Sequence, residues 1–260
     1  CTILGDLNKE GDPNIRVEAN IKNNELSYFD HKVTDCSFKG VFTNEYQKNK
    51  GVSDENSAIL LDDFRGKVHT IPFTTKKMMI LDLKKPIASG AFVSRFDLEQ
   101  LNQTMIGKTL SFGSGKADLR LAFKADVVNL EMQKPFLIGS VVIQNASGTH
   151  ISSKKKFNNS SVDLSFTSKE LKVNQIELNT QNSALKMKGQ SDNFLNFYYD
   201  TPEKIVLNWD IHAEKIDLRD FSFGSGKAAS IKKSTKITPN VINILHQSNA
   251  TINLRAENIV

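Results

Sequence analysis

The sequence has little of what marks disulfide-rich, membrane-spanning or nucleic-acid-binding proteins. It contains only two cysteines, too few for a disulfide framework and in no metal-ligand spacing. No apolar run approaches the roughly 18 residues that a transmembrane helix requires. The net charge of +5 comes from 34 basic and 29 acidic residues that are mostly dispersed as single charges. A nucleic-acid site would cluster its basic residues and interleave aromatics, so we expect no nucleic-acid partner.

Groups with catalytic potential are equally sparse. No Gly-x-Ser-x-Gly nucleophile elbow occurs. The acidic pairs Asp54-Glu55 and Asp62-Asp63 fall in predicted turns, where carboxylates serve as caps and turn formers more often than as acids and bases. The histidines are scattered singly along the chain: His31, His69, His150, His212 and His246. We therefore expect no enzyme, no metal site and no cofactor.

The two cysteines have different contexts. Cys36 alternates with Phe38 and Phe42, which predicts a buried small apolar residue. Cys1 stands first, as the lipidated cysteine does in a mature bacterial lipoprotein, but a cut from a longer chain would give the same start. Both interpretations of Cys1 stay open.

One heptapeptide, SFGSGKA, occurs twice, at residues 111–117 and 222–228. It looks like part of a phosphate-binding loop, but a hydroxyl residue must follow the lysine to ligate magnesium. Alanine follows it in both copies, and the leading glycine of the motif is replaced by Leu110 and Phe221. We therefore predict two exposed polar loops that bind no nucleotide.

The main secondary-structure signal is alternation with a period of two, which is typical of antiparallel strands with one apolar face. Turns rich in Asn, Ser, Gly and Lys separate the strands. Only two short helices are predicted, at residues 97–105 with Asp97 as cap and at residues 239–246 with Thr238 as cap. The longest alternating ladder comprises Ile205, Leu207, Trp209, Ile211 and Ala213.

The repeat extends beyond the heptapeptide. Both copies slip by one residue within a ladder, between Leu61 and Phe64 and between Val173 and Ile176, which predicts a β-bulge or a tight turn at each place. In the last strand of each copy, apolar residues of the first fall opposite apolar residues of the second: Ile87, Ala91, Val93, Phe96 and Leu98 opposite Leu207, Ile211, Ala213, Ile216 and Leu218. Each copy is therefore predicted to end in an alternating strand.

Together these patterns predict a mainly β protein in which tandem antiparallel β-units form an elongated, curved, open sheet or groove with two short helices. The expected boundaries are 1–110 for the first unit, 111–228 for the second, and 229–260 for the start of a third unit that holds a short helix and a strand.

The terminal phrases LNWDIHAEKIDLRDF and ITPNVINILHQSNATINLRAENIV, with the repeated alternating strands, resemble the AsmA-like proteins of Gram-negative bacteria, which are related to TamB. The resemblance implies a periplasmic, membrane-associated protein with an apolar β-groove that takes part in lipid transport and outer-membrane biogenesis. It implies phospholipid acyl chains, and possible envelope membrane proteins, as partners. It also implies an inner-membrane anchor in a segment that these 260 residues do not include, and hence a fragment of a longer chain.

Apolar residues on such strands are either an ordinary core or a surface for lipid. The candidate lipid-facing residues are Val162, Leu164, Phe166, Leu185, Met187, Leu207, Trp209 and Ile211. The alternative is an extracellular β-sandwich module that binds glycan or protein through its loops. A sandwich of this kind would carry exposed aromatics on loops, whereas Trp209 lies within a strand, which favours the groove.

Overall fold

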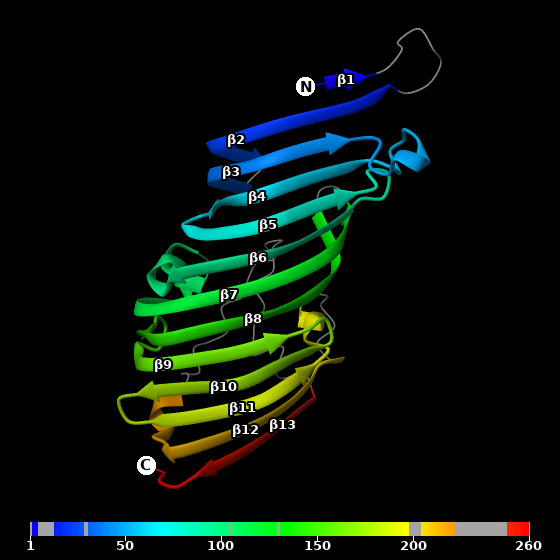
Figure 1. The fold of residues 1–260 in the computed structure, drawn as a ribbon. Coiled ribbons are helices and arrows are strands. Elements are labelled where there is room, and N and C mark those ends of the chain that lie inside the picture. The colour runs from blue at the N-terminus through cyan, green and yellow to red at the C-terminus, as the bar shows by residue number, and fades with distance from the viewer. Residues whose placement is uncertain are drawn as a thin grey trace, which may run out of the picture. The chain divides into compact units, whose positions relative to one another are not determined.

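The fold was obtained as a computed structural model, which describes residues 2–4, 13–28, 31–104, 106–128, 131–197, 204–221 and 249–259. Its thirteen described strands follow chain order across one sheet, so each strand is hydrogen-bonded to the next along the chain (Figure 1). The fold is mainly β, as predicted. One pairing differs from the antiparallel expectation, because β12 (Val206–Lys215) and β13 (Asn249–Ala256) run parallel. A parallel pair needs a long crossover, and the connection between these strands is long enough to provide one.

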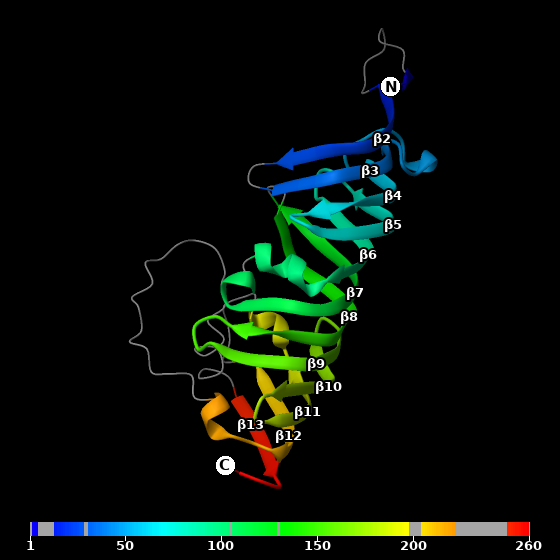
Figure 2. The same ribbon diagram turned by 90° about the vertical axis from the view of Figure 1, so that its left-hand side faces the viewer.

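Contacts divide the chain into two compact units, which are described separately. Unit 1 comprises Cys1–Phe96 and Asp118–Gly139, and unit 2 comprises Asp97–Ala117 and Ser140–Val260. The predicted boundaries do not coincide with these units, since the two longest strands contribute a part to each and β13 belongs to unit 2. Within each unit the sheet is open and curved (Figures 1 and 2). The helix predicted at residues 239–246 lies outside the described residues.

Unit 1 is a meander of strands with short connections. Its elements are β1 (Thr2–Leu4), β2 (Asn14–Tyr28), β3 (His31–Thr43), the 3₁₀ turn η1 (Lys48–Lys50), β4 (Ala58–Val68), β5 (Ile71–Leu81) and β6 (Ile87–Asp97), joined by parts of β7 (Leu110–Val128) and β8 (Glu131–His150). Cys36 is completely buried, as predicted, and burial raises the pKa of its thiol.

A ladder of phenylalanine rings crosses one face of unit 1. Neighbouring rings contact each other with centroids 5.0 to 5.7 Å apart, first edge to face and then stacked at the last pair. The ladder consists of Phe38, Phe64, Phe73, Phe92 and Phe123. Each ring buries part of its apolar surface against the next ring. We name this face of unit 1 the phenylalanine face.

Both predicted bulges are present. In unit 1 the pairing of β3 with β4 shifts by one residue between the pairs Lys39–Asp62 and Ser37–Arg65, and Asp63 at the bulge has a φ of 52°. In unit 2 the pairing of β10 with β11 shifts between Val173 and Ile176. The slip in the apolar ladder was therefore a correct sign of an extra residue in the strand.

The neighbouring apolar residues Phe92 and Val93 of β6 lie on opposite faces of the sheet. Phe92 stacks on Phe123 at 5.4 Å, and Ala88 belongs to the buried cluster around Phe123, so the even-numbered positions of this strand turn toward the phenylalanine face. Val93 pairs with Thr74, is 37% exposed and lies on the opposite face.

Unit 2 continues the meander after a short helical segment. Its elements are the 3₁₀ turns η2 (Leu98–Gln103) and η3 (Ile106–Lys108), the remaining parts of β7 and β8, β9 (Lys155–Phe166), β10 (Glu170–Thr180), β11 (Ala184–Asp192), η4 (Phe194–Phe197), β12, η6 (Leu218–Phe221) and β13. The helix predicted at residues 97–105 is thus a 3₁₀ segment. Asp97 is its cap, as predicted, and the backbone N–H of Asp97 donates to Oε1 of Gln100 at 3.2 Å.

The first copy of the heptapeptide is part of strand β7 and is not the predicted loop. Gly115 explains why glycine stands there: its φ is +122°, and a Cβ at this position would come within 2.7 Å of Leu98 Cδ1 and 2.8 Å of Ala146 Cα. The glycine therefore permits close packing of buried Leu98 against the strand. The strand continues after the heptapeptide, so no helix N-terminus follows the lysine. The second copy lies outside the described residues.

Candidate functional site

The candidate lipid-facing residues lie on β9, β11 and β12 of unit 2, and the strand register places them on one face. Residues paired across adjacent strands point to the same side of a sheet. One row crosses the strands from β9 to β13 at Leu164, Val173, Gly189, Trp209 and Ile252. The next row runs through Val162, Ile176, Met187, Ile211 and Leu254.

Two flanking rows complete this surface. The first consists of Phe166, Leu171, Ser191, Leu207 and Ala250. The second consists of Leu178, Leu185, Ala213 and Ala256. No position in the four rows carries a charge, and we name this surface the uncharged face. The opposite side of the same strands carries charged residues such as Lys188, Asp210 and Arg255.

The uncharged face is buried at one side and exposed at the other. Leu185 and Leu207 are each 6% exposed, whereas the other candidate residues are partly exposed. On strand β13 the face ends in Ile252 and Leu254, which are 57% and 51% exposed. Large apolar side chains exposed in a contiguous row favour contact with an apolar partner.

Sequence reasoning missed six apolar residues larger than alanine that belong to this face. They are Leu171, Val173, Ile176, Leu178, Ile252 and Leu254. The alternation within β10 was a usable signal for the first four. The inclusion of all six widens the face to five strands, or about 19 Å at the usual strand spacing.

Two polar atoms are buried within the uncharged face without a hydrogen-bond partner among the described residues: Oγ of Ser191 and Nε1 of Trp209. The Trp209 ring lies over Gly189, where a Cβ would meet the ring carbon Cδ1 at 2.8 Å. An unpaired buried donor costs about 1–3 kcal/mol, so an acceptor oxygen that reached either atom would be stabilised there.

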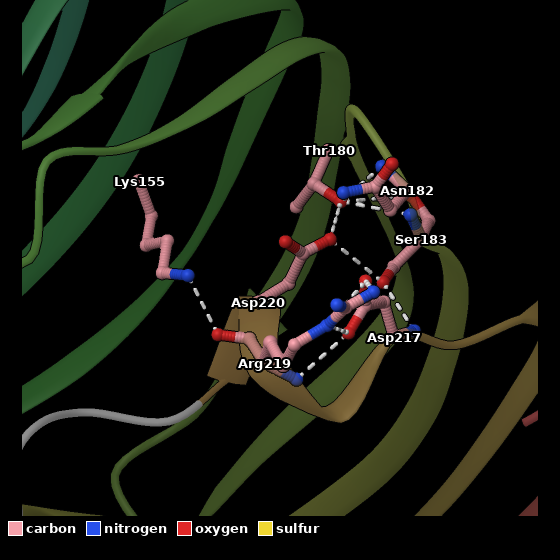
Figure 3. A network of polar contacts seen from close by, with 7 residues as sticks. All are labelled: Lys155, Thr180, Asn182, Ser183, Asp217, Arg219 and Asp220. Atoms are coloured by element: carbon pink, nitrogen blue, oxygen red, sulfur yellow. Dashed lines mark hydrogen bonds and ion pairs between the residues drawn. The ribbon is translucent and has the colours of Figure 1, made fainter. Parts of the chain in front are cut away.

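A network of polar contacts holds the segment that follows β12 (Figure 3). Asp217, which is 2% exposed, accepts hydrogen bonds from Arg219 through Nε at 2.9 Å and Nη2 at 2.7 Å, and its backbone N–H donates to Ser183 Oγ at 2.9 Å. Asp220 accepts from the hydroxyls of Thr180 at 2.6 Å and Ser183 at 2.9 Å. The network therefore ties η6 to the turn between β10 and β11.

The network also shifts two carboxyl groups. Hydrogen bonds from the Arg219 side chain lower the pKa of Asp217 from its ordinary 3.8 to about 2, against the opposing effect of burial. The hydroxyls of Thr180 and Ser183 lower the pKa of Asp220 in the same way. Both groups are thus held ionised at neutral pH by partners that fix the chain, which points to a structural role for the network.

Within the described ranges, no three His, Cys, Asp or Glu side chains are grouped so that they could hold a metal ion. No helix in that part of the chain is both long and apolar enough to cross a bilayer. Comparison of the chain with protein-family models, with curated proteins and with solved structures finds no match.

Proposed function

We propose that this protein is a non-enzymatic envelope protein that binds phospholipid acyl chains on the uncharged face of unit 2. In line with the AsmA-like resemblance, it bridges or transfers phospholipid in the periplasm, is anchored to the inner membrane through a further segment, and supports outer-membrane biogenesis. One observation carries the proposal: four neighbouring rows hold no charge, and two of them end in exposed Ile252 and Leu254.

An acyl chain needs a continuous apolar surface. Each buried methylene contributes about 0.8 kcal/mol, so an acyl chain gains affinity from every methylene that stays on apolar surface. A single desolvated charge on the path would remove several such contributions. The rows from β9 to β13 supply an uninterrupted path across the strands, and Nε1 of Trp209 supplies a donor for an ester oxygen.

The β-sandwich alternative has weaker support. A sandwich covers the apolar face of one sheet with a second sheet. The described strands of each unit instead belong to a single sheet order, and the short 3₁₀ segments between them supply no second layer. Glycan or protein binding through loops remains an outcome that the following experiment can detect.

The test is the phospholipid that co-purifies with the full chain from a Gram-negative host, measured by mass spectrometry beside a thermal melt. Leu164→Asp and Ile211→Glu place a charge on the uncharged face, whereas Asn208→Glu places one on the exposed opposite face of β12. We expect bound lipid in the wild type and in Asn208→Glu, and its loss in the other two variants with a modest change in melting temperature. A lipid-free wild type, or unfolding of both face variants, would support a closed core that binds by its loops.

A further inference from the structure

Unit 1 has a second feature on the side opposite its phenylalanine face. A hollow of about 920 Å³ lies over strands β2 to β6. Ile21 pairs with Phe38, so Asn20 and its partner Lys39 point to the other side, where Lys39 pairs in turn with Asp62. Five of the side chains that line the hollow are basic, namely Lys22, Lys39, Arg65, Lys76 and Lys77, and we name it the basic hollow.

The charges in the basic hollow are unbalanced. All five basic side chains are exposed, and none forms an ion pair in the part of the chain that the structure describes. Asp63 is the acidic residue of the lining, and Asp62 lies beside it in the register. Elsewhere in unit 1, Lys32, Lys67 and Lys84 each pair with a carboxylate at 2.6 to 2.9 Å. Five cations against two carboxylates leave the hollow positive, which favours an anionic partner.

Exposed apolar side chains lie on the same face of unit 1 as the basic hollow. Val93 lines it and is 37% exposed. On β7 and β8, Val127 and Leu137 pack against the buried cluster of Ala88, Phe123 and Ala125. Because side chains alternate along a strand, the residues next to them point to the other side of the sheet. These are Val128, Phe136 and Ile138, which are 54%, 52% and 46% exposed.

We propose that this face of unit 1 docks on an anionic phospholipid surface. The basic side chains meet lipid phosphates, and the exposed apolar side chains enter the interfacial region of the bilayer. Basic residues combined with exposed apolar residues are typical of surfaces that bind membranes peripherally. A nucleic-acid surface would instead interleave aromatic side chains that stack on bases. The aromatic residues of the lining are Phe38 and Phe64, and their rings pack against each other in the phenylalanine face, so they do not offer such a stacking surface.

Docking on a membrane is separate from acyl-chain binding, because it uses a surface of unit 1, whereas acyl-chain binding uses the uncharged face of unit 2. A protein that hands phospholipid to or from a bilayer needs such a contact, but the docking surface stands on its own charges and exposures. The two proposals therefore fail independently, and one set of variants separates them.

The experiment is co-sedimentation of the full chain with vesicles of phosphatidylcholine, alone or mixed with phosphatidylglycerol. The variant Lys39→Glu/Lys76→Glu reverses two charges of the hollow. Its matched control, Lys172→Glu/Lys188→Glu, makes the same net change on exposed positions of unit 2. Because each basic residue at an anionic surface contributes about fivefold in affinity, we expect the hollow variant to bind at least about twentyfold more weakly, and the control to stay within about twofold.

Two further measurements decide what kind of contact is made. Binding should weaken steeply as salt rises, and Phe136→Ser should weaken it at low and at high salt alike. Ile211→Glu should bind vesicles as the wild type does even though it loses co-purified lipid. The proposal is overturned if the wild type does not bind anionic vesicles, if both charge variants lose binding equally, or if a single-stranded RNA oligonucleotide binds more tightly than the vesicles.

Discussion

The apolar faces of the two units arise from the same alternating pattern but are packed differently. In unit 1 five phenylalanine rings contact one another in an unbroken ladder. In unit 2 the corresponding rows hold aliphatic residues and Trp209 over a glycine, and the last strand exposes Ile252 and Leu254. Two buried polar atoms of these rows have no partner in the part of the chain that the structure describes. A face that packs on itself stabilises the fold, whereas a face left incomplete is available for a ligand.

A charge on each face should give the largest contrast. We expect Phe123→Glu to cost more than about 4 kcal/mol and to unfold unit 1, because it buries an unpaired carboxylate in the ladder. Ile211→Glu should cost about 2 kcal/mol, because a carboxylate on the partly exposed face can reach water. Urea unfolding of both variants checks this difference. Equal losses would mean that the two faces are equally closed.

The two glycines of the first heptapeptide also differ in packing, because Gly115 lies in a close contact and Gly113 does not. At Gly115 a Cβ would clash with Leu98 and Ala146, and the backbone has a positive φ, so Gly115→Ala should cost about 2–3 kcal/mol. Gly113→Ala is the matched control, since its Cβ would meet only Ser147 O at 4.0 Å, and it should change stability by less than about 0.5 kcal/mol. Thermal melts that show equal shifts would contradict the packing role of Gly115.

The network around Asp217 predicts a pH dependence. Folding lowers the pKa of Asp217 from 3.8 to about 2, so its stabilising contribution is present above about pH 4 and is lost as the pH falls toward 2. Asp217→Asn should therefore melt below the wild type at pH 7, and the two curves should converge between pH 4 and pH 2. Arg219→Leu should show the same convergence. A constant difference down to pH 2 would contradict the assignment.

Two buried serines give the smallest contrast. Ser191 Oγ has no partner among the described residues, so Ser191→Ala should stabilise the protein by about 1 kcal/mol. Ser160 is similarly buried, but its Oγ donates to Asn158 O and accepts from the backbone N–H of Asn179, both at 3.1 Å. Ser160→Ala should therefore destabilise the protein by about 1 kcal/mol. The same sign for both variants in denaturant unfolding would show that Ser191 has a partner.

The parts of the fold that depend on local pattern were predictable from the sequence. Period-two alternation predicted the mainly β class, and the slip between Val173 and Ile176 indicated an irregularity that is a bulge in the structure. Asp97 was correctly predicted as a cap. The orientation of Val93 was not predictable from β6 alone, since apolar residues occupy both odd and even positions of this strand, as Phe92 and Val93 do. The strand at residues 111–117 was missed because Gly115 serves a close contact with Leu98 and not a turn.

The candidate site likewise has parts that the local sequence pattern predicts and parts that it does not. Alternation was sufficient to select residues of β9, β11 and β12 that share a face, because pairing in an antiparallel meander follows chain order. It was not sufficient to show that β13 extends the face, because a parallel partner at the edge leaves no local mark in the sequence. The unpaired donors and the basic hollow depend on three-dimensional packing and had no sequence signal at all.

Lipid contact on the uncharged face is tested most directly by photo-crosslinking in a Gram-negative host. A photoreactive side chain is placed in turn at Met187 and Ile211 of the uncharged face, at Phe73 of the phenylalanine face, and at exposed Asn208. Adducts are then identified by mass spectrometry. The account predicts phospholipid adducts at Met187 and Ile211 and none at Phe73 or Asn208. Equal labelling at all four positions, or none at Met187 and Ile211, would contradict it.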